Sequence, residues 1–336
     1  MRFEAGENEA GRRLDRILKK VLKGASLSFI YKSIRKDVKV NGKRAKPETL
    51  LAAGDAVEIF LPDELVAELR QGRAPYGARP GKREFEVVFE DENVLAIAKP
   101  FGLLTHGDVA EKKNTLAAQV AAYMAERGVY EPGGLKTFTP APASRLDRNT
   151  TGLVLFGKNY PAARDLALML KGDEGAAEGA CVEKVYLTVV KGLLPSCIIL
   201  KGRMLRETDR NVTRVLPEEA GEGRVMVTEV RPLAVGKGYT LVEARLLTGR
   251  THQIRAQLAA AGYPIIGDRK YGDKEANRIA SQKYGLTAQL LHAGRLTVKR
   301  GTGSLEYLTG ETFRARAPGG FREIAEDLGC TTSETE

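Results

Sequence analysis

A stretch rich in Gly, Pro and Arg divides this chain into two parts with different hydrophobic patterns. Residues 63–83 read DELVAELRQGRAPYGARPGKR, and their second half shows no spacing of apolar residues that could build a core. This composition is typical of a flexible tether, or of an arm that becomes ordered on a nucleic acid. We therefore expect four parts, namely a module at 1–62, a flexible basic linker at 63–83, a larger domain at 84–318 and a frayed tail at 319–336.

The N-terminal module has the pattern of two short helices followed by a small hairpin. Within residues 11–23, apolar side chains recur at helical spacing with basic residues between them. A second segment of the same mixture follows Ser26 and Ser28, either of which could cap a helix. The Asn41-Gly42 pair then predicts a tight turn between two short strands.

The positive charge of the chain is concentrated in this module. The whole chain has a formal net charge of +10, and residues 1–62 carry 14 Lys and Arg against 8 Asp and Glu. A solvated charged surface would explain an excess of this size, but its concentration in a small module favours contact with a polyanion. The basic residues that we expect to contact this polyanion are Lys32, Arg35, Lys36, Lys39, Lys43 and Arg44.

Several classes of protein are excluded by composition. The start of the chain has no apolar run typical of a secretion signal, and no segment approaches the roughly 18 apolar residues needed to cross a bilayer. The 3 cysteines are scattered and the 3 histidines lie far apart, so we expect neither a disulfide framework nor a metal site. We expect a cytoplasmic protein without a metal or membrane partner, and a monomer as the simplest state.

The larger domain alternates apolar strands with helical stretches at about 114–127, 161–171 and 251–262, which predicts a mixed α/β fold. Arg145 and Asp147 lie just before a Thr-Thr-Gly turn and an apolar strand. A carboxylate at the mouth of a strand is a candidate nucleophile or base, although a surface ion pair is the simpler interpretation of this segment by itself. Further along, Arg255 would project from the first turns of a helix and could pair with a carboxylate across a cleft.

Five blocks in order resemble the RluA-type RNA pseudouridine synthase family. They are EDENVLAIAKPFGLLTH, SRLDRNTTGL, KVYLTVVKG, TGRTHQIRAQLAAAGYPIIGD and LLHAGRL. Residues 12–62, with the VNG turn and a later GD before a strand, resemble the S4-type RNA-binding domain. The resemblance implies an α+β protein in which an S4-like domain is joined to a mixed α/β catalytic domain with a central, mainly antiparallel sheet.

The family isomerises uridine in RNA to pseudouridine without a cofactor, and the resemblance implies the same reaction here. By this resemblance, Asp147 is the catalytic nucleophile, and sequence does not decide whether it attacks the sugar C1′ or the base C6. Tyr186 matches the tyrosine that packs against the flipped base and assists proton removal. Arg255 matches the arginine that pairs with the aspartate.

The resemblance also implies a set of substrate-binding residues. Arg145 matches the residue thought to fill the gap left by the extruded base, and Leu291 is expected to wall the uracil pocket. Arg250 and His252 belong to the same block as Arg255 and are expected to bind substrate. Three positions depart from the usual family pattern, namely Ser144 for His, Asn149 for Asp and Thr151 for Ser, and they suggest a branch with its own target.

Ribosomal large-subunit RNA is the expected substrate, because family members with this N-terminal module mostly act on it. The alternatives are transfer RNA and a non-catalytic RNA-binding or ribosome-assembly factor that keeps the fold. A glycosidase-like hydrolase would need two carboxylates flanking the bond, and no second acidic residue stands out near Asp147. The role of the charged stretch 201–226 stays open between a substrate-specific hairpin and a solvated insertion.

Overall fold

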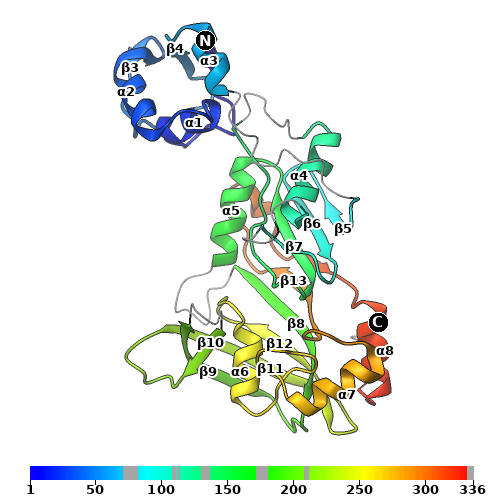
Figure 1. Cartoon of the computed structure of the whole chain (residues 1–336). Coiled ribbons are helices and arrows are strands. Elements are labelled where there is room, and N and C mark those ends of the chain that lie inside the picture. Colours follow the sequence, from blue (N-terminus) through cyan, green and yellow to red (C-terminus); the bar gives the residue numbers. More distant parts are fainter. Residues whose placement is uncertain are drawn as a thin grey trace. The chain divides into compact units, whose positions relative to one another are not determined.

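The computed structural model describes residues 1–70, 82–107, 111, 114–129, 137–171, 181–207 and 212–330. The chain separates into two compact units (Figure 1). Unit 1 comprises residues 1–83, 107–141 and 157–164, and unit 2 comprises residues 84–106, 142–156 and 165–336. The first division between the units falls between Arg83 and Glu84, and the later segments 107–141 and 157–164 also belong to unit 1.

Unit 1 contains a four-stranded sheet in the order β1-β4-β2-β3 with its helices. Its elements are β1 (Arg2–Glu4), α1 (Leu14–Val21), α2 (Leu27–Asp37), β2 (Val38–Val40), β3 (Lys43–Arg44), β4 (Ala56–Ile59), α3 (Asp63–Arg70) and α4 (Leu116–Glu126). The two expected helices and the hairpin are present. Asn41 and Gly42 have φ values of 51° and 73°, as a primed hairpin turn requires, and the Ser26 hydroxyl accepts the Phe29 N–H at the start of α2.

The beginning of the expected linker is helical. Residues 63–70 form α3, and Val66 is buried in the same core as Ile17, Ile34 and Val57. A helix of eight residues is stable here because it buries this side chain against the module. The linker prediction was therefore wrong for residues 63–70, and residues 71–81 lie outside the described part of the chain.

Unit 2 is built on one large mixed sheet. Its central order is β10-β9-β11-β12-β8-β13-β7-β6-β5, and β14 pairs with β13. The strands are β5 (Glu86–Glu90), β6 (Val94–Lys99), β7 (Thr151–Gly157), β8 (Val182–Lys191), β9 (Ile198–Glu207), β10 (Val212–Leu216), β11 (Arg224–Gly236), β12 (Tyr239–Leu246), β13 (Leu291–Val298) and β14 (Thr312–Arg314). The helices that follow or cover them are α5 (Tyr160–Lys171), α6 (Gln253–Ala260), α7 (Lys274–Tyr284), η1 (Gly303–Leu308) and α8 (Gly319–Asp327). The pair β13–β7 is parallel, whereas β13–β8, β8–β12, β12–β11 and β11–β9 are antiparallel.

Alternating side chains of β8 and β12 fill a core on each face of this sheet. Val190 and Val242 pack with Ile254 of α6 on one face. Val189 and Leu241 pack on the other face with residues of α7 and α8. This period-two alternation assigns α6, and with it the block TGRTHQIR, to one defined face.

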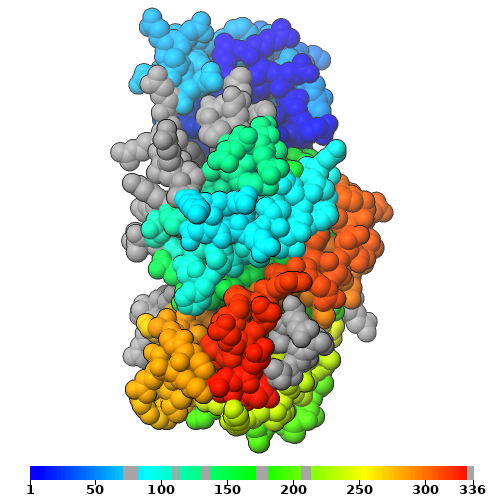
Figure 2. Space-filling view, turned by 90° about the vertical axis from the view of Figure 1, so that its right-hand side faces the viewer, coloured from blue at the N-terminus to red at the C-terminus, as the bar shows by residue number. Residues whose placement is uncertain are grey.

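The C-terminal segment from residue 319 is an ordered helix, so the prediction of a frayed tail was wrong for its first part. In α8 the side chains of Phe321 and Ile324 are buried. Figure 2 shows α8 (red) beside α7 (orange-yellow), and the two helices share a core through Ala280. The helix has only nine residues, and this packing accounts for its stability.

β7 and β13 approach each other so closely that one position between them requires Gly. Gly152 has a φ of 108°, and a Cβ there would lie 2.2 Å from the Ala293 carbonyl oxygen. No other residue fits this place without moving one of the two strands. The glycine follows the loop that carries Asp147, so the close approach fixes where that loop ends.

None of the described helices combines the length and apolar character needed to cross a membrane.

Candidate active site

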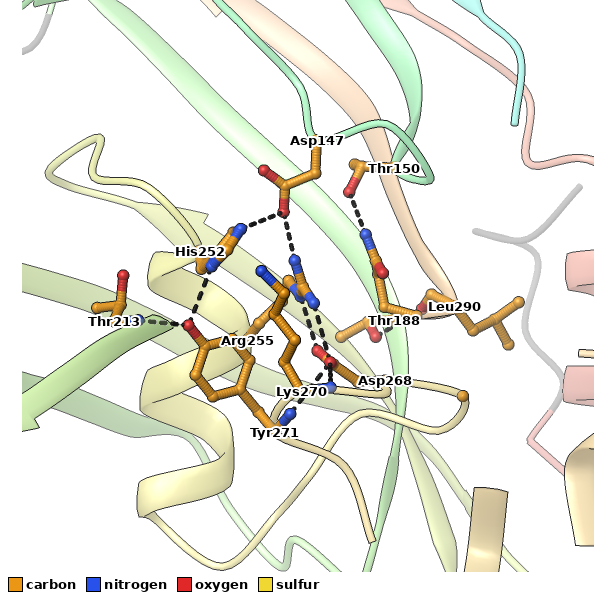
Figure 3. Close-up of polar contacts among 12 residues, drawn as sticks. Asp147, Thr150, Thr188, Thr213, His252, Arg255, Asp268, Lys270, Tyr271 and Leu290 are labelled. Carbon is orange, nitrogen blue, oxygen red and sulfur yellow. Dashed lines mark hydrogen bonds and ion pairs between the residues drawn. The ribbon is translucent and has the colours of Figure 1, made fainter. Parts of the chain in front are cut away.

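The Asp147 carboxylate faces α6 from the loop that precedes β7. Arg255, in the first turn of α6, donates from Nη1 to Asp147 Oδ2 at 2.7 Å (Figure 3). The pairing of Arg255 with a carboxylate, expected from the sequence, is therefore present. The Asp147 side chain keeps 28% of its surface exposed, whereas that of Arg255 keeps 6%. The carboxylate is thus aimed by a buried cation and is still open to a reactant.

A second carboxylate, which sequence reasoning missed, holds the other edge of the same guanidinium. Asp268 is fully buried and accepts from Arg255 Nε at 2.7 Å and Nη2 at 2.9 Å. Its Oδ1 also accepts the backbone N–H groups of Lys270 and Tyr271. Burial alone would raise the pKa of Asp268, but Arg255 and these N–H groups lower it. Burial would likewise lower the pKa of Arg255, and the two carboxylates raise it above its usual value.

Asp268 could not be recognised from its local sequence. It follows Gly267 in a loop, and its partner lies 13 residues earlier, so only the fold brings the two together. A usable signal was the placement of an acidic residue two positions after the apolar pair Ile265 and Ile266, where a buried charge needs a partner.

Residues 99–106 fix the loop that bears Asp147 by hydrogen bonds to its main chain. The ammonium group of Lys99, whose residue is 1% exposed, donates to the carbonyl oxygens of Leu103 and Arg148 at 2.8 Å and of Pro100 at 3.0 Å. Thr105 Oγ1 donates to the Leu146 carbonyl at 2.8 Å and accepts the Leu146 N–H at 3.2 Å. The residues on both sides of Asp147 are therefore fixed. Burial lowers the pKa of Lys99 to about 7, and the charge of Asp147 opposes this shift.

Tyr186 lies on β8 on the α6 side of the sheet and packs against a core that contains Leu291. Burial raises the pKa of the Tyr186 hydroxyl, and the charge of Asp147 raises it further. The phenol is therefore neutral beside the carboxylate. Tyr186 and Leu291 therefore belong to one cluster of side chains on this face.

His252 precedes α6 and faces Asp147. Its Nε2 lies 3.8 Å from Asp147 Oδ2, and burial lowers the pKa of the ring.

Arg250 donates from Nε to the Val225 carbonyl at 3.4 Å. Arg145 is exposed and lowers the pKa of His106, which burial already lowers. The six basic residues of the N-terminal module are all exposed, so none of them is used in its core.

Within the described residues, no group of three or more His, Cys, Asp or Glu side chains is placed to hold a metal ion. The third histidine, His292, is buried between a hydroxyl and a carbonyl, with Nδ1 2.8 Å from Thr151 Oγ1 and Nε2 2.9 Å from the Ala315 oxygen. It joins β13 to β7 and does not face Asp147.

Comparison with known proteins gives a consistent result for sequence and fold. The family model described as RNA pseudouridylate synthase matches residues 93–260. The chain is 34% identical to ribosomal large subunit pseudouridine synthase C of Pasteurella multocida, over 93% of this chain and 88% of the relative. It is 33% identical to the Escherichia coli K12 protein of the same name, over 93% and 90%. Among solved structures, human RNA pseudouridylate synthase domain containing 4 matches with a TM-score of 0.56 at 21% identity, over 73% of this chain and 94% of that one.

Proposed function

Because the chain belongs to the RNA pseudouridylate synthase family, we propose that it modifies uridines of ribosomal large-subunit RNA with Asp147 as its nucleophile. The chain is an isomerase that converts uridine in RNA to pseudouridine. The single observation that supports the assignment of Asp147 is its contact with Arg255, a buried guanidinium that is itself fixed by Asp268. A factor that had lost catalysis would have no need to keep a half-exposed carboxylate aimed in this way.

The reaction breaks a C–N glycosidic bond and forms a C–C bond between the same sugar and the same base. A carboxylate nucleophile divides this change into easier steps, because its covalent bond to the substrate forms first and is broken when the isomer is released. The proton on C5 leaves as the new bond is made, and N1 gains one, so atoms balance without a cofactor. The guanidinium of Arg255 orients the attacking carboxylate toward the substrate.

Tyr186 and Leu291 are the proposed walls of the uracil pocket. A target base must first leave its stack, at a cost of a few kcal/mol that stacking and backbone contacts offset. The neutral phenol of Tyr186 can pack against the base and donate a hydrogen bond, whereas its raised pKa disfavours a phenolate that would act as base. Arg145 and Arg250 are proposed to bind RNA beside the pocket, where guanidinium planes can stack on bases or pair with phosphates.

The N-terminal module is proposed to be an S4-type RNA-binding domain. The six basic residues that we expect to bind RNA lie on α2 and the adjoining hairpin, and all six are exposed. The Lys39 ammonium lies 5.4 Å from the ring centre of Phe60, an exposed aromatic residue. An exposed aromatic ring beside lysines is suited to unpaired bases and phosphates.

The choice of ribosomal large-subunit RNA rests on the names of the relatives in Pasteurella multocida and Escherichia coli. Transfer RNA is the second candidate, since the site described above would act equally on any extruded uridine. The experiment is a chemical map of pseudouridines in total RNA from cells that lack the gene, complemented with the wild type or with Asp147→Asn.

We expect one or a few pseudouridines in large-subunit RNA to disappear without the gene and to return only with the wild-type protein. A loss confined to transfer RNA would overturn the substrate. Restoration by Asp147→Asn would overturn the assignment of the nucleophile. If no position changes, and no other enzyme covers the same sites, the non-catalytic interpretation would replace the proposal.

A further inference from the structure

A chain of hydrogen bonds runs from the hairpin β9–β10 to the imidazole that faces Asp147. The backbone N–H of Thr213, on β10, donates to the Tyr271 hydroxyl oxygen at 2.6 Å. That oxygen lies 3.0 Å from His252 Nδ1 (Figure 3). The Thr213 hydroxyl makes a second hydrogen bond between β10 and this region, because it donates to the carbonyl oxygen of Thr251, the residue before His252, at 2.9 Å.

The order of donors along this chain determines which nitrogen of His252 carries the proton. A backbone N–H can only donate, so the Tyr271 oxygen accepts from Thr213. The Tyr271 hydroxyl can then donate its own proton, and His252 Nδ1 lies within hydrogen-bond distance to accept it. A neutral imidazole that accepts at Nδ1 carries its hydrogen at Nε2. That N–H is the group 3.8 Å from Asp147 Oδ2.

The backbone at His252 is also held in an uncommon conformation. His252 has a φ of 56° and is, with Asn41, one of two non-glycine residues with positive φ among those described. Asn41 lies in a hairpin turn that favours this value, but His252 directly precedes α6 and makes no side-chain cap bond there. Strain of this kind, on the order of 1–3 kcal/mol, persists where the surroundings hold a residue for a purpose. Here it turns the imidazole toward Asp147 and Tyr271.

We propose that Tyr271 is a positioning residue, which fixes the neutral His252 ring with its Nε2–H toward Asp147 and is itself held by the main chain of the hairpin β9–β10. This inference rests on the proposed role of Asp147 as nucleophile. The opposite tautomer would turn a nitrogen lone pair toward a carboxylate oxygen. The fixed tautomer instead presents a donor that can bind the carboxylate or a polar atom of the flipped nucleotide when the site closes.

The charged stretch 201–226, whose role the sequence left open, thereby contributes to the support of the active site. Part of it, the strand β10, supplies the N–H that orients Tyr271, so the hairpin is part of the support of the site. The charged groups that face His252 are Asp147, Arg255, Lys270 and Asp268. The aromatic ring of Tyr271 lies edge-on to His252, with 5.7 Å between ring centres, and 5.3 Å from the Arg255 guanidinium carbon. Its hydroxyl can therefore be tested separately from its ring by Tyr271→Phe.

The first test reads the tautomer directly and does not depend on activity. The chain has only 3 histidines, so a long-range proton–nitrogen NMR spectrum of the full chain resolves each ring, and His252→Ala identifies the signal of residue 252. We expect the Nε2–H tautomer in the wild type and a loss of that single tautomer in Tyr271→Phe. The matched control is Tyr307→Phe, which removes a tyrosine hydroxyl that donates to Asp91 at 2.6 Å and should leave the His252 signals unchanged. A wild-type Nδ1–H tautomer would overturn the proposal.

The second test asks whether Tyr271 acts through His252. In Tyr271→Phe we expect kcat to fall about tenfold, the effect of one oriented hydrogen bond, with KM changed by less than about twofold. The double variant with His252→Ala should be no slower than His252→Ala alone, because both changes remove the same donor. Additive losses would show that Tyr271 acts independently of His252. If the wild type makes no pseudouridine, the proposed function fails while the tautomer measurement still decides the orientation of His252.

Discussion

At the scale of single residues, the site is organised by one guanidinium that serves two carboxylates in different surroundings. Asp268 takes the Nε edge of Arg255 and is fully buried, whereas Asp147 takes Nη1 and keeps part of its surface open. Removing one partner of a buried ion pair strongly destabilises the folded protein, because the other charge is left uncompensated. A partly exposed carboxylate has water as a substitute partner. The two carboxylates therefore differ in what they contribute, although both contact the same group.

We predict that Asp147→Asn abolishes pseudouridine formation and changes the free energy of unfolding by less than about 1 kcal/mol. Asp268→Asn should lower both activity and stability, the latter by about 3 kcal/mol, because Arg255 then keeps only one charged partner. Urea unfolding and single-turnover assays on both variants check this. Equal stability of the two variants would contradict the assigned division of roles.

The lowered pKa of Asp268 predicts a specific dependence of stability on pH. Its folded-state pKa lies below that of the unfolded chain, about 3.9, so the unfolded state binds the proton first as the pH falls. The stability that Asp268 contributes is fully present above about pH 4 and is lost as the pH falls through the folded-state value. The difference in unfolding free energy between wild type and Asp268→Asn should thus be constant from pH 6 to 8 and shrink below about pH 4. A difference that stays constant down to pH 3 would contradict this pKa.

At the scale of elements, the loop 99–106 fixes the loop of Asp147 at two points, through Lys99 to Arg148 and through Thr105 to Leu146. We predict that Thr105→Val, which keeps the shape and removes both hydroxyl bonds, lowers kcat about tenfold, since a small misplacement of a nucleophile is costly. The matched control is Thr240→Val. Thr240 is buried as deeply and makes the same two bonds, to the Gly192 carbonyl and from the Leu194 N–H, away from Asp147.

Both variants should lose about 2 kcal/mol of stability, because each loses two hydrogen bonds that usually contribute about 1 kcal/mol apiece. Only Thr105→Val should be slower in a single-turnover assay of pseudouridine formation. If Thr240→Val loses as much activity as Thr105→Val, the loss reflects general destabilisation, and the positioning role of Thr105 is refuted.

Local patterns predicted the elements whose signals lie within a few residues of each other. The hairpin turn at Asn41-Gly42, the helix that bears Arg255 and the apolar strand β7 belong to this group. Partners that meet only through the fold were missed, as the pair Arg255 and Asp268 shows. The helix α8 was missed because its nine residues begin with Gly319 and Gly320, which have weak helical preference, and its stability comes from packing beside α7.

At the scale of the whole molecule, the charge of the chain is expected to control its affinity for RNA. A net charge of +10 attracts any polyanion, and contacts to phosphate release counterions, so binding weakens as salt rises. The dependence of log Kd on log salt measures how many cations contact phosphate. The basic residues of the hairpin, Lys39, Lys43 and Arg44, are exposed and carry none of the core of unit 1. They are therefore the residues whose removal should change this slope without unfolding the module.

We predict that the triple change Lys39→Gln, Lys43→Gln and Arg44→Gln reduces the salt slope by about 2 and weakens RNA binding at low salt at least about tenfold. The matched control removes three exposed charges from unit 2, by Lys274→Gln, Arg316→Gln and Arg322→Gln. Both triples lower the net charge equally, so a general electrostatic attraction would respond alike, whereas a binding surface on the module responds only to the first. Fluorescence anisotropy with a large-subunit RNA fragment, in an Asp147→Asn background to prevent turnover, distinguishes the two cases. Equal slopes for both triples would remove the N-terminal module from the RNA-binding surface and leave its charge as a solubility feature.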